Sequence, residues 1–172
     1  DLDRLLALEV TDYTYRDTVT RGVAERINAV IWFSDLRGYT KITDTAPPEE
    51  IIPLLNDYAA PVIAAVRSAG GEVLKLIGDG VLAIFRADDD AQACRCALGA
   101  EASLRAGIKA VNERRAVGGQ PVTSVYLGLH IGEAFYGNIG SEDRLDFTVV
   151  GPAVNEASRI AAMCRSVDRG VV

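Results

Sequence analysis

The chain has 172 residues, of which 49% are hydrophobic, enough to fill the core of one domain without disulfides or a structural metal. Its net charge of -6 and isoelectric point near 4.8 argue against a broad phosphate-binding surface, so we expect no nucleic acid and no membrane among its partners. No apolar run approaches the roughly 20 residues of a membrane span, and no signal peptide is recognisable. The three cysteines lack the spacing of a disulfide framework, which favours a reducing, cytoplasmic compartment.

The first part of the chain predicts a linker, a strand and a helix. Residues 1–26 are charged and weakly patterned, and we interpret them as a linker from an upstream regulatory domain to one domain over residues 27–172. An apolar run at residues 29–33 predicts a buried strand that leads to Asp35. Prolines and acids at residues 47–50 suit the start of a helix with apolar side chains at helical spacing, which Pro61 is expected to kink.

The middle of the chain predicts a β-hairpin and a second helix. Apolar runs at residues 72–77 and 81–85 are separated only by a Gly-Asp-Gly turn, which places Asp79 at the tip of the hairpin. An acidic cluster at residues 88–90 then caps an amphipathic helix. The apolar side of this helix is predicted to contain Cys94, Ala97, Ala100, Leu104, Ile108 and Val111.

The last third predicts two more strands and a helix. From Val125, apolar and other residues alternate with period two, which is typical of a strand, and a hairpin arm extends to Gly140 before a short strand at residues 147–150. Pro152 begins a final helix whose apolar side is expected to contain Val154, Ile160 and Met163. The element order predicts an α+β fold, namely a ferredoxin-like βαββαβ core with an added β-hairpin.

Asp35 and Asp79 are the central pair of candidate functional residues. Each lies where a hydrophobic strand ends, and the ferredoxin-like order makes the two strands neighbours. Two carboxylates beside glycines suit Mg²⁺ with bound phosphates, because this ion takes most of its ligands from substrate and water. The pattern alone supports equally well a helix cap at Asp35 and an ordinary turn residue at Asp79.

Three sequence blocks in one order carry a resemblance to a known family. They are FSDLRGYT at residues 33–40, EVLKLIGDG at residues 72–80 and DFTVVGPAVNEASR at residues 146–159. Together they resemble the signature blocks of class III adenylyl cyclases, over a region from about Ile27 to the end of the chain. The resemblance implies the class III cyclase fold and the conversion of ATP to cyclic AMP with two Mg²⁺ ions, for which Mn²⁺ can substitute.

The resemblance also implies a role for each matching residue around the phosphates. Asp35 and Asp79 match the two metal aspartates, with the carbonyl of Leu36 as a further ligand. Gly38, Tyr39 and Thr40 match the loop whose backbone amides hold the triphosphate at a helix N-terminus. Arg144 is a weaker match to a residue that contacts the β-phosphate.

Two further positions match the residues that read the purine. Lys75 matches the lysine that donates a hydrogen bond to adenine N1. Guanine N1 cannot accept this hydrogen bond, because it carries a proton. Thr148 stands where the commonest family pattern has an aspartate that accepts from the adenine N6 amine. A hydroxyl is neutral and can also donate, so this variant implies weaker discrimination against guanine. Such threonine variants resemble a subgroup associated with bicarbonate stimulation, which makes bicarbonate sensitivity a hypothesis here.

Asn155 and Arg159 lie four residues apart on one face of the last predicted helix. The resemblance implies that the asparagine orients the ribose and that the arginine stabilises the pentavalent phosphorus during attack by the 3′-oxygen. In the family, the metal aspartates come from one subunit and the purine, asparagine and arginine positions from the other. Because this chain carries both sets, the resemblance implies a homodimer with shared active sites.

Several alternatives remain open at this stage. A catalytically silent cyclase-homology module keeps the same fold, although it does not require the metal aspartates that are present here. Guanylyl specificity calls for an acid at the position of Lys75, and a diguanylate cyclase calls for a Gly-Gly-acid-Glu-Phe run that the chain lacks. Members of the family continue past the last helix into a further strand pair, so we expect the catalytic domain to be truncated at its C-terminus.

Overall fold

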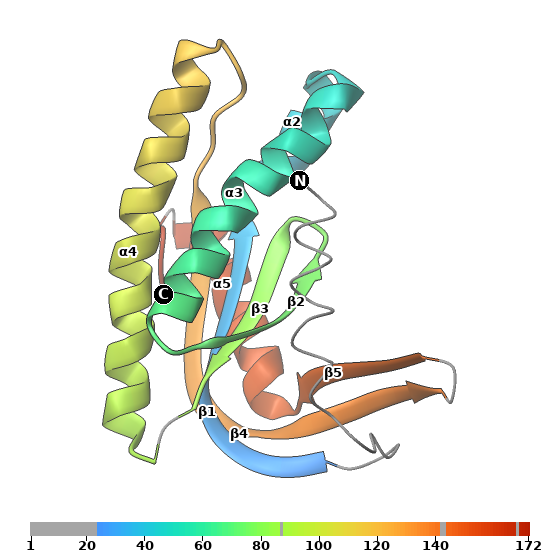
Figure 1. The fold of residues 1–172 in the computed structure, drawn as a ribbon, viewed down its shortest axis with the longest axis vertical. Coiled ribbons are helices and arrows are strands. Elements are labelled where there is room, and N and C mark those ends of the chain that lie inside the picture. The colour runs from blue at the N-terminus through green and yellow to red at the C-terminus, as the bar shows by residue number, and fades with distance from the viewer. Residues whose placement is uncertain (1–23, 87, 142–143, 168) are drawn as a thin grey trace.

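The computed structural model describes residues 24–86, 88–141, 144–167 and 169–172 (Figure 1). Its elements, in chain order, are β1 (Ala24–Leu36), α2 (Tyr39–Thr45), α3 (Pro48–Ser68), β2 (Glu72–Ile77), β3 (Gly80–Phe85), α4 (Asp90–Val117), β4 (Val125–Ser141), β5 (Arg144–Val150) and α5 (Pro152–Val167). Within these residues, a five-stranded antiparallel sheet has the order β2-β3-β1-β4-β5. The predicted α+β fold with a β4–β5 hairpin added to a βαββαβ core is therefore confirmed.

Helices cover both faces of the sheet. Helices α3 and α4 pack side by side on one face, and α5 lies on the other (Figure 1). The β4–β5 hairpin extends beyond the helices, because β4 pairs with β1 along its first part and with β5 along its last. Each face of the central strands therefore has its own apolar cluster, as the period-two alternation of β4 predicts.

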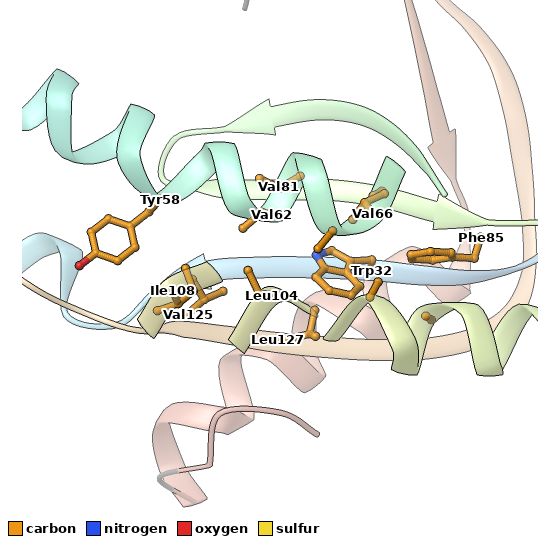
Figure 2. Packing of buried hydrophobic residues seen from close by; sticks show 14 of the residues in the cluster. Trp32, Tyr58, Val62, Val66, Val81, Phe85, Leu104, Ile108, Val125 and Leu127 are labelled. Atoms are coloured by element: carbon orange, nitrogen blue, oxygen red, sulfur yellow. The ribbon is translucent and has the colours of Figure 1, made fainter. Parts of the chain in front are cut away.

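The larger apolar cluster lies between the sheet and the α3/α4 layer (Figure 2). Trp32 of β1 is fully buried against Phe85 of β3, with ring centroids 6.0 Å apart. Val66 of α3 and Leu104 of α4 are also fully buried there. Burying each such side chain contributes about 1.5–3 kcal/mol, so this cluster fixes the strands that carry the candidate site.

Helix α3 continues through Pro53 and Pro61, so the kink expected at Pro61 does not end the helix. Pro61 lies against Gly107 of α4, where an added Cβ would meet the Pro61 Cβ at 2.8 Å. Glycine at this position therefore allows the two helices to approach closely.

The prediction of the apolar side of α5 is correct only in part, because Val154 packs partly buried against the apolar cluster on this face but Met163 does not. The buried residues of α5 are Ala153, Ala157, Ala161 and Cys164, whereas Met163 is 52% exposed. The reason is the short distance between α5 and β4, since a Cβ added to Gly128 would lie 2.4 Å from the Ala157 carbonyl oxygen. Only small side chains fit between elements at this separation.

Strand β1 begins inside the predicted linker. Residues 1–23, most of the expected linker, lie outside the described residues, whereas residues 24–26 belong to β1. At the other end, residues 170–172 hydrogen-bond to the free edge of β4 through Leu127 and Leu129. No helix in the described part of the chain is long and apolar enough to cross a membrane.

Candidate active site

Asp35 and Asp79 lie together at one end of the sheet, as the sequence predicts. The β1/β3 register pairs Ser34 with Val81, which brings the end of β1 beside the β2–β3 turn. The backbone N–H of Leu36 donates to Asp79 Oδ2 at 3.2 Å. A Cβ at Gly80 would lie 2.5 Å from the Ser34 carbonyl oxygen, so glycine is required where the turn meets β1. The glycine of the Gly-Asp-Gly turn therefore allows the Asp79 carboxylate to lie close to the Asp35 carboxylate.

The Asp35 carboxylate perturbs Asp79. The pKa of Asp79 is raised to about 6, first by burial, then by hydrogen bonding to Asp35 and by the negative charge of Asp35. Two anionic groups this close repel one another, so a bound cation would relieve their repulsion. The donor set is oxygen only, as Mg²⁺ prefers. Nowhere in the described residues do three or more His, Cys, Asp or Glu side chains gather as a metal cluster.

A cleft of about 120 Å³ lies beside the two carboxylates. Its walls come from the end of β1, from the β2–β3 turn and from apolar side chains of α3 such as Leu55. Nucleotide-sized ligands need about 300–1,000 Å³, so the cleft is too small for ATP. It has room for ions and part of a phosphate chain. Lys75, Thr148, Asn155 and Arg159 are not among its lining residues.

The loop from Arg37 to Thr40 follows Asp35 directly. Gly38 has φ +67°, in the left-handed region that favours glycine, and it precedes α2 with no side-chain cap on the helix. The loop is held from the opposite side, since the Arg37 N–H donates to the Ser124 carbonyl at 2.8 Å and the Thr123 hydroxyl donates to the Arg37 carbonyl. The predicted triphosphate loop, including Tyr39, thus starts beside the carboxylates.

The two purine positions lie on the outer strands. Lys75 of β2 forms an ion pair with Asp146 of β5, with Nζ and Oδ2 2.6 Å apart. Thr148 of β5 is buried, with 8% exposure. Strands β2 and β5 are at opposite ends of the strand order, so this contact depends on the strong curl of the sheet (Figure 1).

The predicted catalytic pair Asn155 and Arg159 projects from α5, and both residues are exposed. Arg159 donates to Glu156 one turn earlier, at 2.6 Å. The Arg144 backbone belongs to β5, but its side chain lies outside the described part of the structure. Asn155 and Arg159 therefore do not line the Asp35/Asp79 cleft of their own chain.

The sequence interpretation missed two charged residues near the site. Arg165, near the end of α5, donates to Asp35 Oδ2, and Asp146 pairs with Lys75. Arg165 is 130 residues from Asp35 in sequence, so no local pattern indicates the contact. Asp146 offered a signal, since it lies two residues from Thr148 and shares its face of a strand.

Known nucleotide cyclases are similar to this chain in sequence and in structure. A sequence model of the family described as the adenylate and guanylate cyclase catalytic domain matches residues 23–168. An adenylate cyclase from Anabaena cylindrica is 37% identical over 153 residues, covering 87% of this chain and 30% of that protein. Adenylate cyclase 1 from Rhizobium meliloti is 29% identical over 174 residues, covering 93% of this chain and 26% of that protein. The chain thus spans less than a third of either relative.

Solved structures include cyclases of both specificities. The adenylyl cyclase CyaB from P. aeruginosa superimposes with a TM-score of 0.77 at 26% identity, covering 81% of this chain and 74% of that one. The guanylyl cyclase Cya2 gives 0.75 at 31% identity, covering 81% and 71%. Since the family model spans nearly the whole described chain, this protein belongs to the family of adenylate and guanylate cyclase catalytic domains.

Proposed function

We propose that the chain is the catalytic domain of an adenylate cyclase, which converts ATP to 3′,5′-cyclic AMP and pyrophosphate. The observation that carries the proposal is the pair of adjacent carboxylates, Asp35 and Asp79, beside a cleft at the end of the sheet. The raised pKa of Asp79 indicates that burial and the neighbouring Asp35 disfavour its negative charge. A fold that maintains such a pair suits a cation and phosphate site better than a structural role.

Asp35, Asp79 and the carbonyl of Leu36 are the residues proposed to hold Mg²⁺ or Mn²⁺. When bound, two such ions neutralise the phosphates and lower the pKa of the attacking 3′-hydroxyl. The protein must keep its own ligands few, because phosphate oxygens and water complete the coordination of Mg²⁺. Two carboxylates without a third neighbouring acid in the described region fit that requirement.

The remaining proposed residues bind and orient the nucleotide. Backbone amides of residues 38–40 donate to the triphosphate, and Arg144 is proposed to contact the β-phosphate. Asn155 orients the ribose so that its 3′-oxygen faces the α-phosphorus. Arg159 donates to the α-phosphate oxygens as charge develops on them, a task that suits a guanidinium that never deprotonates. The new P–O bond forms from the 3′-oxygen as the bond to pyrophosphate breaks.

Base specificity is assigned to adenine because of Lys75. The family contains cyclases of both specificities, so family membership alone does not decide the substrate. An ammonium group only donates, and adenine N1 accepts whereas guanine N1–H does not. Lys75 is 27% exposed in its side chain, which leaves the ammonium accessible to a base.

We further infer that two copies of the chain share their active sites. The cleft is smaller than a nucleotide, and the purine and α5 residues do not line it. Apolar side chains are exposed near both half-sites, with Leu76 and Ile77 46% and 44% exposed beside Asp79, and Phe135 48% exposed on the β4–β5 hairpin. A head-to-tail dimer would bury these groups and complete two sites. The cytoplasmic location and the upstream regulatory domain expected from the sequence also remain proposals.

A cyclase assay tests the function directly. The purified chain with Mg²⁺ or Mn²⁺ is expected to form cyclic AMP from ATP and much less cyclic GMP from GTP. Asp35→Ala and Asp79→Ala should each reduce turnover by at least about 1,000-fold while the circular dichroism spectrum is unchanged, because both side chains lie at strand ends. Glu113→Gln, an exposed substitution on α4, is the matched control and should keep full activity. Lack of turnover in a properly folded chain that also includes the expected C-terminal strand pair would identify the silent regulatory module instead.

A further inference from the structure

Arg37 is attached to the start of β4 and to the segment before it, through both its backbone and its side chain. The Arg37 N–H donates to the Ser124 carbonyl at 2.8 Å, and the Thr123 hydroxyl donates to the Arg37 carbonyl oxygen. The Arg37 guanidinium lies over the Tyr126 ring, 5.9 Å from its centroid. The residue that follows Asp35 and Leu36 is therefore held from one side by residues 123–126.

Thr123 is itself fixed to the α3/α4 layer. Its backbone N–H donates to the Tyr58 hydroxyl at 2.7 Å, and its carbonyl accepts from Asn112 Nδ2 at 2.8 Å. Tyr58 also donates to Asn112 Oδ1, and it is buried at the edge of the apolar cluster, with 1% exposure (Figure 2). Because both backbone groups of Thr123 are bonded to side chains of the two helices, its hydroxyl contacts Arg37 from a fixed position.

The contacts from residues 123 and 124 set the direction of two neighbouring peptide groups. A trans peptide group is planar, with its C=O and its N–H in opposite directions, and no cis peptide bond occurs in the described residues. The Arg37 N–H points toward Ser124, so the Leu36 carbonyl points away from Ser124. The Arg37 carbonyl points toward Thr123, so the Gly38 N–H points away from Thr123.

The Leu36 carbonyl is thereby directed to the side of the carboxylates. Leu36 ends the extended strand β1, in which the N–H and the C=O of one residue point to the same side. Its N–H donates to Asp79 Oδ2 at 3.2 Å, so its carbonyl also lies on the Asp79 side. The backbone groups that face the cleft are thus oriented by contacts made on the opposite side of the chain.

We propose that Thr123 is a positioning residue for the phosphate chain, since its hydroxyl holds the Arg37 carbonyl and so directs the Gly38 N–H toward the nucleotide. This inference rests on the proposed adenylate cyclase function, in which the amides of residues 38–40 donate to the triphosphate. Gly38, at φ +67°, is free of the restraint that a side chain imposes, so an outside contact is needed to fix this N–H. A donor that is oriented before binding loses less entropy when the anion binds.

The test uses Mg²⁺ with inorganic tripolyphosphate, a probe that has the phosphate chain without base or ribose. Binding is followed by the amide NMR signal of Gly38 in the isotope-labelled chain, which also gives the dissociation constant. Thr123→Val replaces the hydroxyl by a methyl group and is expected to weaken binding by about 3- to 10-fold, with a smaller change of the Gly38 signal. Thr123→Ala, which also lacks the hydroxyl, should show a similar loss, and Thr123→Ser should restore affinity to within about twofold.

Thr45→Val is the matched control, because the exposed Thr45 hydroxyl also donates to a backbone carbonyl, that of Lys41 at 2.9 Å. It should leave the affinity for the probe within about twofold of the wild type. The inference is overturned if Thr123→Val binds the probe as tightly as the wild type, or if Thr123→Ser is as weak as Thr123→Val. It is also overturned if the Gly38 signal of the wild type does not respond to the probe.

A cyclic AMP assay of the same proteins separates this inference from the proposed function. Binding of tripolyphosphate that depends on the Thr123 hydroxyl, in a chain without turnover, would support the positioning role and contradict only the proposed catalytic function. Turnover with the same kcat/KM for ATP in the wild type and in Thr123→Val would contradict only the positioning role.

Discussion

The Asp79 carboxylate illustrates how a single residue can oppose stability while it serves a site. In the folded chain its pKa is raised to about 6 from an ordinary value of 3.8, because burial and the nearby Asp35 disfavour its charge. The folded state thus binds a proton more tightly than the unfolded state. The contribution of Asp79 to the free energy of unfolding is therefore most favourable below pH 3.8, and this contribution is lost as the pH rises to about 6.

Removing this charge should stabilise the metal-free protein. At pH 7 in EDTA, Asp79→Asn is expected to raise the free energy of unfolding by about 1 kcal/mol, a figure reduced for solvent screening because the site is partly open. The gain should shrink to nearly zero at pH 4, where the wild-type carboxylate is protonated in the folded state. Urea unfolding at both pH values measures the difference. A gain that is equal at pH 4 and pH 7 would contradict the assigned cause, and Glu113→Gln controls for the loss of one surface charge.

At the scale of elements, one buried charge joins α3 to α4 and to the segment that leads into β4. Arg115 of α4 is fully buried, with its Nη1 2.6 Å from Asp57 Oδ2 of α3 and its Nε donating to the Pro121 carbonyl at 2.7 Å. From the same segment, Thr123 contacts the Arg37 carbonyl of the predicted triphosphate loop. The Arg115 side chain therefore connects the packing of α3 and α4 to the position of the loop that contains Arg37.

Two adjacent arginines give a matched comparison of this cluster. Arg115→Ala should lower the free energy of unfolding by about 2–5 kcal/mol, because it empties a fully buried site and removes the donor of the Pro121 carbonyl. Arg114 also lies 2.6 Å from Asp57, but its side chain is 63% exposed. Arg114→Ala should therefore change stability by less than about 1 kcal/mol. Chemical unfolding measures both variants, and similar losses in the two would show that burial does not decide the strength of the pair.

The contact between α5 and β4 depends on glycine in the strand. Gly128→Ala should destabilise the chain by about 1–3 kcal/mol, since its Cβ would lie 2.4 Å from the Ala157 carbonyl oxygen and 2.5 Å from the Ala161 nitrogen. Gly99 in α4 is the control, because an added Cβ there meets nothing within 4 Å. Gly99→Ala should stabilise by about 0.5–1 kcal/mol through helix propensity. Thermal or urea unfolding compares the two, and a neutral Gly128→Ala would contradict the close packing.

For the whole molecule, the sequence predicts the features that depend on local pattern. Strand alternation, the Gly-Asp-Gly turn and the ferredoxin-like element order predict that Asp35 and Asp79 lie on neighbouring strands, but the pattern alone does not distinguish a metal site from a helix cap and a turn residue. The buried side of α5 is not predictable in this way, because hydrophobicity favours Met163 whereas the distance to Gly128 favours alanine. Partners such as Arg165 and Asp146 depend on long-range geometry. The roles of the predicted nucleotide residues remain untested.

The shared-site dimer is best tested by complementation between two inactive chains. Asp79→Ala removes a residue of the cation half-site, and Arg159→Ala removes a residue of the α5 half-site. If each active site takes one half from each copy, a mixed dimer contains one doubly damaged site and one intact site. Random exchange makes half of the dimers mixed, so an equimolar mixture should reach about a quarter of wild-type activity.

Each variant alone should be inactive, and neither substitution touches the exposed apolar residues proposed to form the interface. Mixed dimers are quantified by differential tagging before the assay. Recovery in proportion to their abundance would support sites built from two chains, whereas demonstrated mixed dimers without activity would place all the catalytic groups of one site in one chain.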